Sequence, residues 1–100
     1  MKLKLEEVRQ RIATALIAHN TNENNALSVA NALTLAEADG LRSHGLSRVA
    51  AYAKQARSGK VDGNATPLVS YVSSAALRID AQSGFAYPAL EIATQELLTL

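Results

Sequence analysis

Residues 42–48, with the sequence RSHGLSR, bring a histidine and an arginine close together among small neighbours. If a helix begins near Ser43, then His44, Arg48 and Tyr52 follow at four-residue spacing and lie along one face. An arginine fork can hold a carboxylate by two hydrogen bonds. A histidine can donate a proton to an atom that gains electrons. This set suits a small 2-oxo or 2-imino acid, with Ser43 and His44 as candidate catalytic residues and Arg48 and Tyr52 as candidate substrate-binding residues.

Each of these residues also has a structural explanation. A histidine and an arginine one turn apart are often two solvated side chains, and Tyr52 suits amphipathic packing equally well. Ser43 would orient the imidazole or accept a hydrogen bond from it, while Gly45 would let a substrate approach the backbone. The second histidine, His19, is expected to be exposed near a helix C-terminus.

The first part of the chain predicts three helices. Apolar residues recur at three- and four-residue spacing from Leu5 to Leu16, and the Asn-rich stretch 19–24 ends this helix. The second helix is expected to run to about Asp39, with Gly40 in the left-handed conformation that closes a helix. Its inward residues would be Ala26, Val29, Ala30, Leu33 and Ala36. The third helix ends at Gly59, and its apolar stripe comprises Leu46, Val49, Ala50, Ala53 and Ala56.

The second part predicts a hairpin followed by one more helix. The stretch GKVDGNATP, 59–67, is typical of a loop, and 68–72 and 76–80 are typical of two antiparallel strands. The last helix has Pro88 near its first turn, where a missing N–H costs nothing. Its apolar stripe reaches the end of the sequence without a residue that closes a helix. We therefore expect a truncated domain whose last helix exposes apolar surface.

The predicted fold class is α+β. An N-terminal domain of three helices spans 1–66, and 67–100 begins a second domain with the hairpin and its helix. Aromatic residues in the second part are expected to build the core, namely Tyr71, Phe85 and Tyr87.

Composition narrows the possible partners. Ten basic and nine acidic residues give a net charge of +1, which makes no overall case for nucleic acid or an anionic membrane. The segment from Arg42 to Lys60 nevertheless holds five cations and no acid. The absence of cysteine excludes disulfides, and the chain has no metal-ligand spacing, signal peptide or membrane span. We expect a cytoplasmic protein without a bound metal.

Two stretches carry a family resemblance. AEADGLRSHGLSRVAAYAKQARSGKVDG and ALRIDAQSGFAYPALEIA resemble the N-terminal part of the malate/L-lactate dehydrogenase-like oxidoreductases, whose fold is not the Rossmann type. GKVDGNATP and RIDAQSGFAYPAL look most like the branch that reduces Δ1-piperideine-2-carboxylate and Δ1-pyrroline-2-carboxylate. Branches that act on malate, lactate, sulfolactate or ureidoglycolate share much of this framework.

The resemblance implies specific roles. His44 matches the family's proton donor, Ser43 matches a relay that an aspartate completes, and Arg48 matches the residue that grips the substrate carboxylate. The relay aspartate and the dinucleotide-binding segments lie beyond Leu100 in the family, so cofactor-binding residues stay unknown here. The resemblance also implies an NADPH or NADH cofactor, a homodimer several-fold longer, and an inactive 100-residue fragment.

Three functions follow as hypotheses. The first is NAD(P)H-dependent reduction of a cyclic 2-imino acid to the L-amino acid. The second is a malate- or lactate-type 2-hydroxy acid dehydrogenase of the same family. The third, of another class, is a small helical interaction module whose basic face binds an acidic partner or nucleic acid, with affinity that falls steeply with salt.

Overall fold

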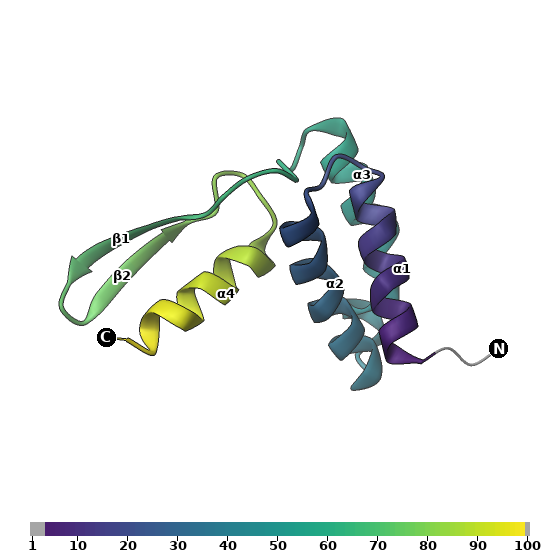
Figure 1. The fold of residues 1–100 in the computed structure, drawn as a ribbon, viewed down its shortest axis with the longest axis horizontal. Helices are drawn as coiled ribbons and strands as arrows, with labels where there is room; N and C mark the ends of the chain where they lie inside the picture. The colour runs from purple at the N-terminus through teal and green to yellow at the C-terminus, as the bar shows by residue number, and fades with distance from the viewer. Residues whose placement is uncertain (1–3, 100) are drawn as a thin grey trace.

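The computed structural model describes residues 4–99 of the chain. Three helices pack together at one end of the molecule, and a hairpin with one helix forms the other end (Figure 1). The molecule measures 50 × 30 × 21 Å. The helices are α1 (Leu5–Ile17), α2 (Glu23–Ala38), α3 (Val49–Ser58) and α4 (Ala86–Leu97). The strands are β1 (Leu68–Ser73) and β2 (Ala76–Asp80), and two short 3-10 turns are η1 (Arg42–His44) and η2 (Leu46–Arg48). The predicted α+β class is confirmed.

The core lies between α1, α2 and α3. Leu16, Val29 and Leu33 are 0% exposed, and α3 adds Ala53 and Ala56. Small side chains on α3 let it approach the other helices closely. The predicted inward face of α2 is confirmed for the four residues that are buried, which are Ala26, Val29, Ala30 and Leu33.

The helix ends follow the local signals in the sequence. α1 ends at Ile17, and the Asn22 side chain caps α2 by accepting from the Asn25 backbone N–H at 2.8 Å. Gly40 has a φ of +80°, which is the left-handed conformation predicted for it. Gly59, where the third helix was predicted to end, has a φ of +82° and is left-handed too.

The start of α3 differs from the prediction. The helix begins at Val49 rather than near Ser43, because the backbone of Gly45, with φ −110° and ψ −127°, is not helical and separates η1 from η2. Leu46 consequently lies in a turn and is exposed instead of belonging to the apolar stripe; Ala50 is exposed too.

Gly45 also has a different role from the one expected. It is buried, and a Cβ added there would lie 2.6 Å from Glu37 Oε1 and 3.0 Å from the Glu37 backbone nitrogen. Glu37 Oε1 accepts a hydrogen bond from the Leu46 backbone N–H at 2.9 Å. The missing side chain therefore admits α2 against the turn and leaves no room for a substrate at this glycine.

The hairpin pairs β1 with β2 in the predicted antiparallel arrangement. Its register runs from Leu68 opposite Asp80 to Tyr71 opposite Leu77, with an irregularity before Ser73. The expected burial of Tyr71 is wrong: its side chain is 58% exposed because the strands extend away from the helical core. The Tyr71 hydroxyl instead donates to the Glu96 carboxylate of α4, which raises the pKa of this tyrosine.

Hydrogen bonds hold the linker between α3 and β1, residues 59–67, in place. The buried Asn25 side chain donates from Nδ2 to the carbonyl oxygens of Gly63, at 2.9 Å, and Ala65, at 2.8 Å. The Asp62 backbone N–H donates to the Ser83 carbonyl at 2.9 Å, which ties the linker to the loop before α4. The path of the chain between α3 and the hairpin is thus held from both sides.

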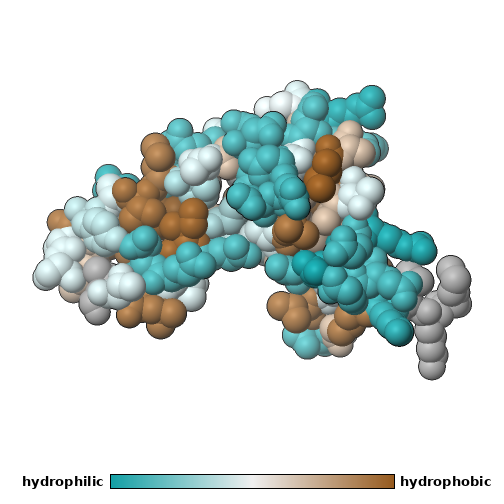
Figure 2. All heavy atoms as spheres, viewed as in Figure 1, coloured by the Kyte–Doolittle hydropathy of each residue, from teal (hydrophilic) through white to brown (hydrophobic). Residues whose placement is uncertain are grey.

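Apolar side chains gather on the hairpin and α4, as Figure 2 shows at the end of the molecule away from the three-helix core. Leu90 is 59% exposed and Leu97 is 55% exposed, which confirms the expected apolar surface on the last helix. Among residues 4–99, none of the helices has the length and apolar character needed to cross a membrane.

Candidate functional site

Ser43, His44 and Arg48 form one hydrogen-bonded group on the surface. Arg48 Nε donates to the Ser43 carbonyl oxygen at 2.7 Å, and Ser43 Oγ lies 2.9 Å from His44 Nδ1. All three residues are exposed. They come together through the double turn η1–η2 rather than along the helix face that the spacing predicted.

The Arg48 guanidinium is held on one side and open on the other. Its bond from Nε is the one side-chain hydrogen bond that Arg48 makes within residues 4–99. Both Nη groups are therefore left to donate to a ligand. Two parallel N–H donors at the end of a guanidinium match the two oxygens of a carboxylate.

The His44 imidazole has one ring nitrogen engaged. A serine hydroxyl can both donate and accept, so the contact between Ser43 Oγ and Nδ1 can be kept when the imidazole is neutral and when it is protonated. Nε2 is then the nitrogen at which His44 can exchange a proton with a substrate.

Tyr52 lies one turn into α3 and packs against the segment that begins α4. Its ring centroid is 5.8 Å from that of Phe85 and 6.5 Å from that of Tyr87, with interplanar angles of 55° and 56°. Tilted aromatic pairs at these separations are favourable. Phe85 is 6% exposed, as expected for a core residue.

Tyr87 belongs to this neighbourhood, which the sequence did not reveal. It is half-buried, and burial raises the pKa of Tyr87. The Tyr52 phenol raises the pKa of Tyr87 further, whereas the Arg48 cation lowers it. No local pattern links Tyr87 with Tyr52, because the two rings come from different helices.

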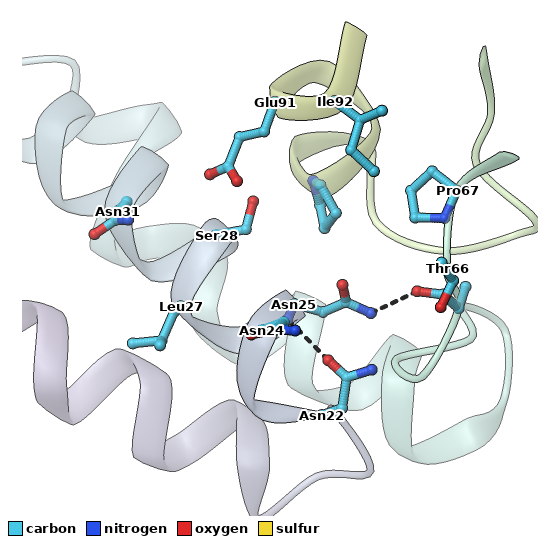
Figure 3. A pocket seen from close by; sticks show the side chains of 12 residues that line it. Asn22, Asn24, Asn25, Leu27, Ser28, Asn31, Thr66, Pro67, Glu91 and Ile92 are labelled. Carbon is cyan, nitrogen blue, oxygen red and sulfur yellow. Dashed lines mark hydrogen bonds between the residues drawn. The ribbon is translucent and has the colours of Figure 1, made fainter. Parts of the chain in front are cut away.

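A separate cleft of about 410 Å³ lies between α2, the linker and α4 (Figure 3). Its lining is mixed: the polar residues include Asn22, Asn24, Asn31 and Glu91, and the apolar ones include Ile92. Ser43, His44 and Arg48 are not among the residues that line it. The cleft is therefore distinct from the candidate carboxylate site.

His19 differs from the expectation and takes no part in the site. It is half-buried rather than exposed, and its Nδ1 lies 2.7 Å from the Ala15 carbonyl oxygen at the end of α1. A ring nitrogen this close to a carbonyl carries the proton, so the imidazole caps the helix. Within the described part of the chain, no three His, Asp or Glu side chains are grouped as a metal site would require.

Comparison with known proteins identifies the family. The family model described as malate/L-lactate dehydrogenase matches residues 3–100. The chain belongs to the malate/L-lactate dehydrogenase family. As a family member it is 38% identical over 98 residues to the Δ1-pyrroline-2-carboxylate reductase of Ancylobacter novellus, covering 98% of this chain and 29% of the relative.

Two other relatives extend the comparison. The (2R)-3-sulfolactate dehydrogenase (NADP+) of Chromohalobacter salexigens is 40% identical over 98 residues, covering 98% of this chain and 29% of the relative. The crystal structure of Δ1-piperideine-2-carboxylate reductase from Pseudomonas syringae pv. tomato superimposes with a TM-score of 0.94 at 33% identity, covering 99% of this family member and 30% of that chain. The chain thus spans about 30% of the length of the relatives that it matches.

Proposed function

We propose that this chain forms the amino-terminal part of an oxidoreductase that reduces a cyclic 2-imino acid, Δ1-pyrroline-2-carboxylate or Δ1-piperideine-2-carboxylate, to the L-amino acid. The observation that carries the proposal is the hydrogen-bonded group of Ser43, His44 and Arg48, which leaves the Arg48 Nη groups and His44 Nε2 open. Similarity to reductases named for these two imines supports the choice of substrate.

Each side chain has a defined task in the proposed reaction. The Arg48 Nη groups bind the substrate carboxylate, and Tyr52 forms a side wall. When bound, NADPH or NADH supplies the hydride that reaches C2 of the substrate. The electron pair of the C=N double bond moves onto nitrogen, which takes its proton from His44 Nε2. Ser43 Oγ keeps the imidazole oriented. His44 and Arg48 thus place a proton donor beside the group that binds the carboxylate, as reduction by hydride transfer requires.

The second candidate is a malate- or lactate-type 2-hydroxy acid dehydrogenase. The sulfolactate dehydrogenase relative favours it, because its identity to this chain is as high as that of the reductases. The same residues would act, with the proton going to a carbonyl oxygen instead of an imine nitrogen. Assaying cyclic imines beside 2-oxo acids with the same enzyme preparation separates the two candidates.

The test uses the full-length enzyme that contains this chain. We expect His44→Ala to lower kcat by a factor of about 100 to 10 000, because the proton donor is lost. Arg48→Lys should raise KM about tenfold or more, because lysine keeps the charge but loses the fork. Steady-state kinetics with NADPH and Δ1-piperideine-2-carboxylate measure both constants.

Matched controls keep this test specific. His19→Ala removes an imidazole that caps a helix, and Arg57→Lys changes an exposed arginine of α3 in the same way as Arg48→Lys. Both should keep kcat and KM within about twofold of the parent, since neither residue belongs to the group of Ser43, His44 and Arg48. If His44→Ala kept most of its kcat, the assigned proton donor would be wrong.

A further inference from the structure

We propose that the cleft between α2, the linker and α4 is a binding site for an organic ammonium group, which is held between Glu91 of α4 and the buried hydroxyl of Ser28 on α2. This inference goes beyond the proposed function and does not depend on it, because Ser43, His44 and Arg48 do not line the cleft. A volume of about 410 Å³ and a position where two parts of the fold meet are typical of small-molecule sites (Figure 3).

The first support is a buried hydroxyl without a partner. Ser28 lies within α2 and is 5% exposed, and its Oγ makes no hydrogen bond within residues 4–99. A serine inside a helix normally bonds to the carbonyl oxygen four residues before it or points to water, and Ser28 does neither. Figure 3 shows this hydroxyl on the α2 wall of the cleft, turned toward α4. An unsatisfied buried hydroxyl costs free energy, which a ligand recovers when it supplies the missing hydrogen bond.

The second support is a carboxylate without a cation. Glu91 lies on the second turn of α4, and Figure 3 shows its carboxylate extended toward the wall that carries Ser28. The one ion pair among residues 4–99 joins Arg9 to Glu6, so no cation in this part of the chain neutralises Glu91. Among the described residues that line the cleft, Glu91 is also the only charged one. A cleft with one carboxylate and no cation attracts a positively charged ligand.

The third support is the chemistry of the remaining wall. Both Nδ2 protons of Asn25 are used by the two linker carbonyls, so its Oδ1, which can only accept, is the atom left for a ligand. Figure 3 shows this oxygen pointing into the cleft. Pro88 and Ile92 add apolar surface to the same lining. Oxygens that accept, beside apolar side chains, suit a ligand that donates hydrogen bonds and has a short hydrocarbon body.

Thr34 shows that an unpaired hydroxyl alone does not make such a site. Within residues 4–99 it is the other buried side chain whose hydroxyl has no partner, and it lines a different cleft. The charged residues of that cleft, Glu6 and Arg9, already bind each other. The cleft at Thr34 therefore leaves no free charge for a ligand, whereas the cleft at Ser28 does.

Ligand-observed NMR with the full-length enzyme tests the site, with n-butylamine as the probe and 1-butanol as its uncharged counterpart. The amine should bind in about the millimolar range, as its small size allows, and the alcohol about tenfold more weakly, because only the amine pairs with the carboxylate. Glu91→Gln should weaken binding of the amine about tenfold, to the affinity of the alcohol. Glu23→Gln is the matched control, because Glu23 is an exposed acid of α2 outside the cleft, and it should leave the affinity unchanged.

Ser28→Ala separates a ligand contact from damage to the fold. The substitution should not lower the thermal midpoint of the free enzyme, because the hydroxyl that it removes has no hydrogen bond to lose. Affinity for n-butylamine should nevertheless fall about three- to tenfold, as for one lost hydrogen bond. Ser58→Ala changes an exposed serine of α3 and should keep the affinity of the parent. Equal amine affinity of the parent, Ser28→Ala and Glu91→Gln would mean that the amine binds elsewhere and would overturn the inference.

The same measurements distinguish two sources of the ammonium group. It belongs either to a free molecule or to a lysine in the rest of the polypeptide, since this chain spans about 30% of the length of its relatives. Binding of n-butylamine that Glu91→Gln weakens identifies a free molecule. A lysine in the cleft would block n-butylamine, and Glu91→Gln would then lower the thermal midpoint of the full-length enzyme more than Glu23→Gln does.

Either of these results supports an ammonium site at Glu91. If n-butylamine does not bind and Glu91→Gln unfolds at the same temperature as Glu23→Gln, the carboxylate has no cationic partner of either kind. That combination would overturn the inference and leave the proposed function unaffected, because the cleft and the group of Ser43, His44 and Arg48 share no residue.

Discussion

At the scale of single residues, Asn25 shows how one buried amide can organise a chain. Its two Nδ2 protons have separate acceptors, the carbonyl oxygens of Gly63 and Ala65, and the side chain is buried. Without the amide, the Gly63 carbonyl would keep its hydrogen bond from the Asn22 backbone N–H at 3.1 Å, but the Ala65 carbonyl would lose its partner inside the protein. Such loss costs more free energy than a hydrogen bond gains, because a buried polar group is left unsatisfied.

We predict that Asn25→Ala lowers the free energy of unfolding by about 1–3 kcal/mol. Urea unfolding followed by circular dichroism measures the change. Asn24→Ala is the matched control, since Asn24 is exposed in the same helical turn and its substitution should cost less than about 0.5 kcal/mol. Similar effects at both positions would show that the linker is not anchored by Asn25.

The residue types of the candidate site could be predicted, but its geometry could not. The types of Ser43, His44 and Arg48 indicate carboxylate binding and proton transfer wherever they stand close together. Their arrangement depends on Gly45 meeting Glu37 of α2, a contact that four-residue spacing does not reveal. The contact between the Tyr52 and Tyr87 rings was missed for the same reason, because the two residues come from different helices.

At the scale of elements, the double turn η1–η2 is shaped by α2. Glu37 accepts the hydrogen bond from the Leu46 backbone, and Gly45 gives it the space to do so. The turn then folds Arg48 back so that its Nε reaches the Ser43 carbonyl. A continuous helix would have spread the same side chains along its face.

We predict that Gly45→Ala and Gly59→Ala differ in kinetics although each adds one methyl group. At Gly45 the new Cβ would lie 3.0 Å from the Glu37 backbone, so the turn must shift, costing about 1–3 kcal/mol and lowering kcat/KM. At Gly59 nothing lies within 4 Å, and only the left-handed φ costs about 1 kcal/mol. Thermal unfolding and kcat/KM of the full-length enzyme measure both effects. Equal kcat/KM for the two variants would contradict the role assigned to the turn.

Helix ends and strands, which depend on the local sequence, were predicted well. Gly40 and Gly59 end their helices, and the paired strands lie where 68–72 and 76–80 were expected to be strands, because turns and caps are decided locally. Burial was predicted less well. Tyr71 and Leu46 were expected to be buried and are exposed. Burial depends on which element packs against a residue, and the local sequence does not reveal that.

At the scale of the whole molecule, the two parts differ in how much surface they bury. The helical part encloses Leu16, Val29 and Leu33 completely, while β1 has no buried residue. A two-stranded sheet with little burial is marginal by itself. The division into domains at 1–66 and 67–100 and the cytoplasmic homodimer remain our predictions.

We predict that hydrogen exchange separates the two parts of the isolated 100-residue chain. Amides of α2 should be the most protected, and those of β1 and β2 should exchange close to the rate of an unfolded peptide. In the full-length enzyme we propose that further chain packs against the strands, so that their amides gain protection. Mass spectrometry of peptic fragments measures this, and equal protection of α2 and the hairpin in the isolated chain would contradict the prediction.

The composition of β1 has a practical consequence for work with this chain. Its sequence LVSYVS contains no charged residue, whereas Arg78 and Asp80 lie on β2. Charged side chains on an edge strand discourage its pairing with strands of other molecules. The edge of β1 is therefore less protected against such pairing than the edge of β2. We therefore expect ribbon-like aggregation of the isolated chain at high concentration to start at β1, and Val72→Lys to reduce it.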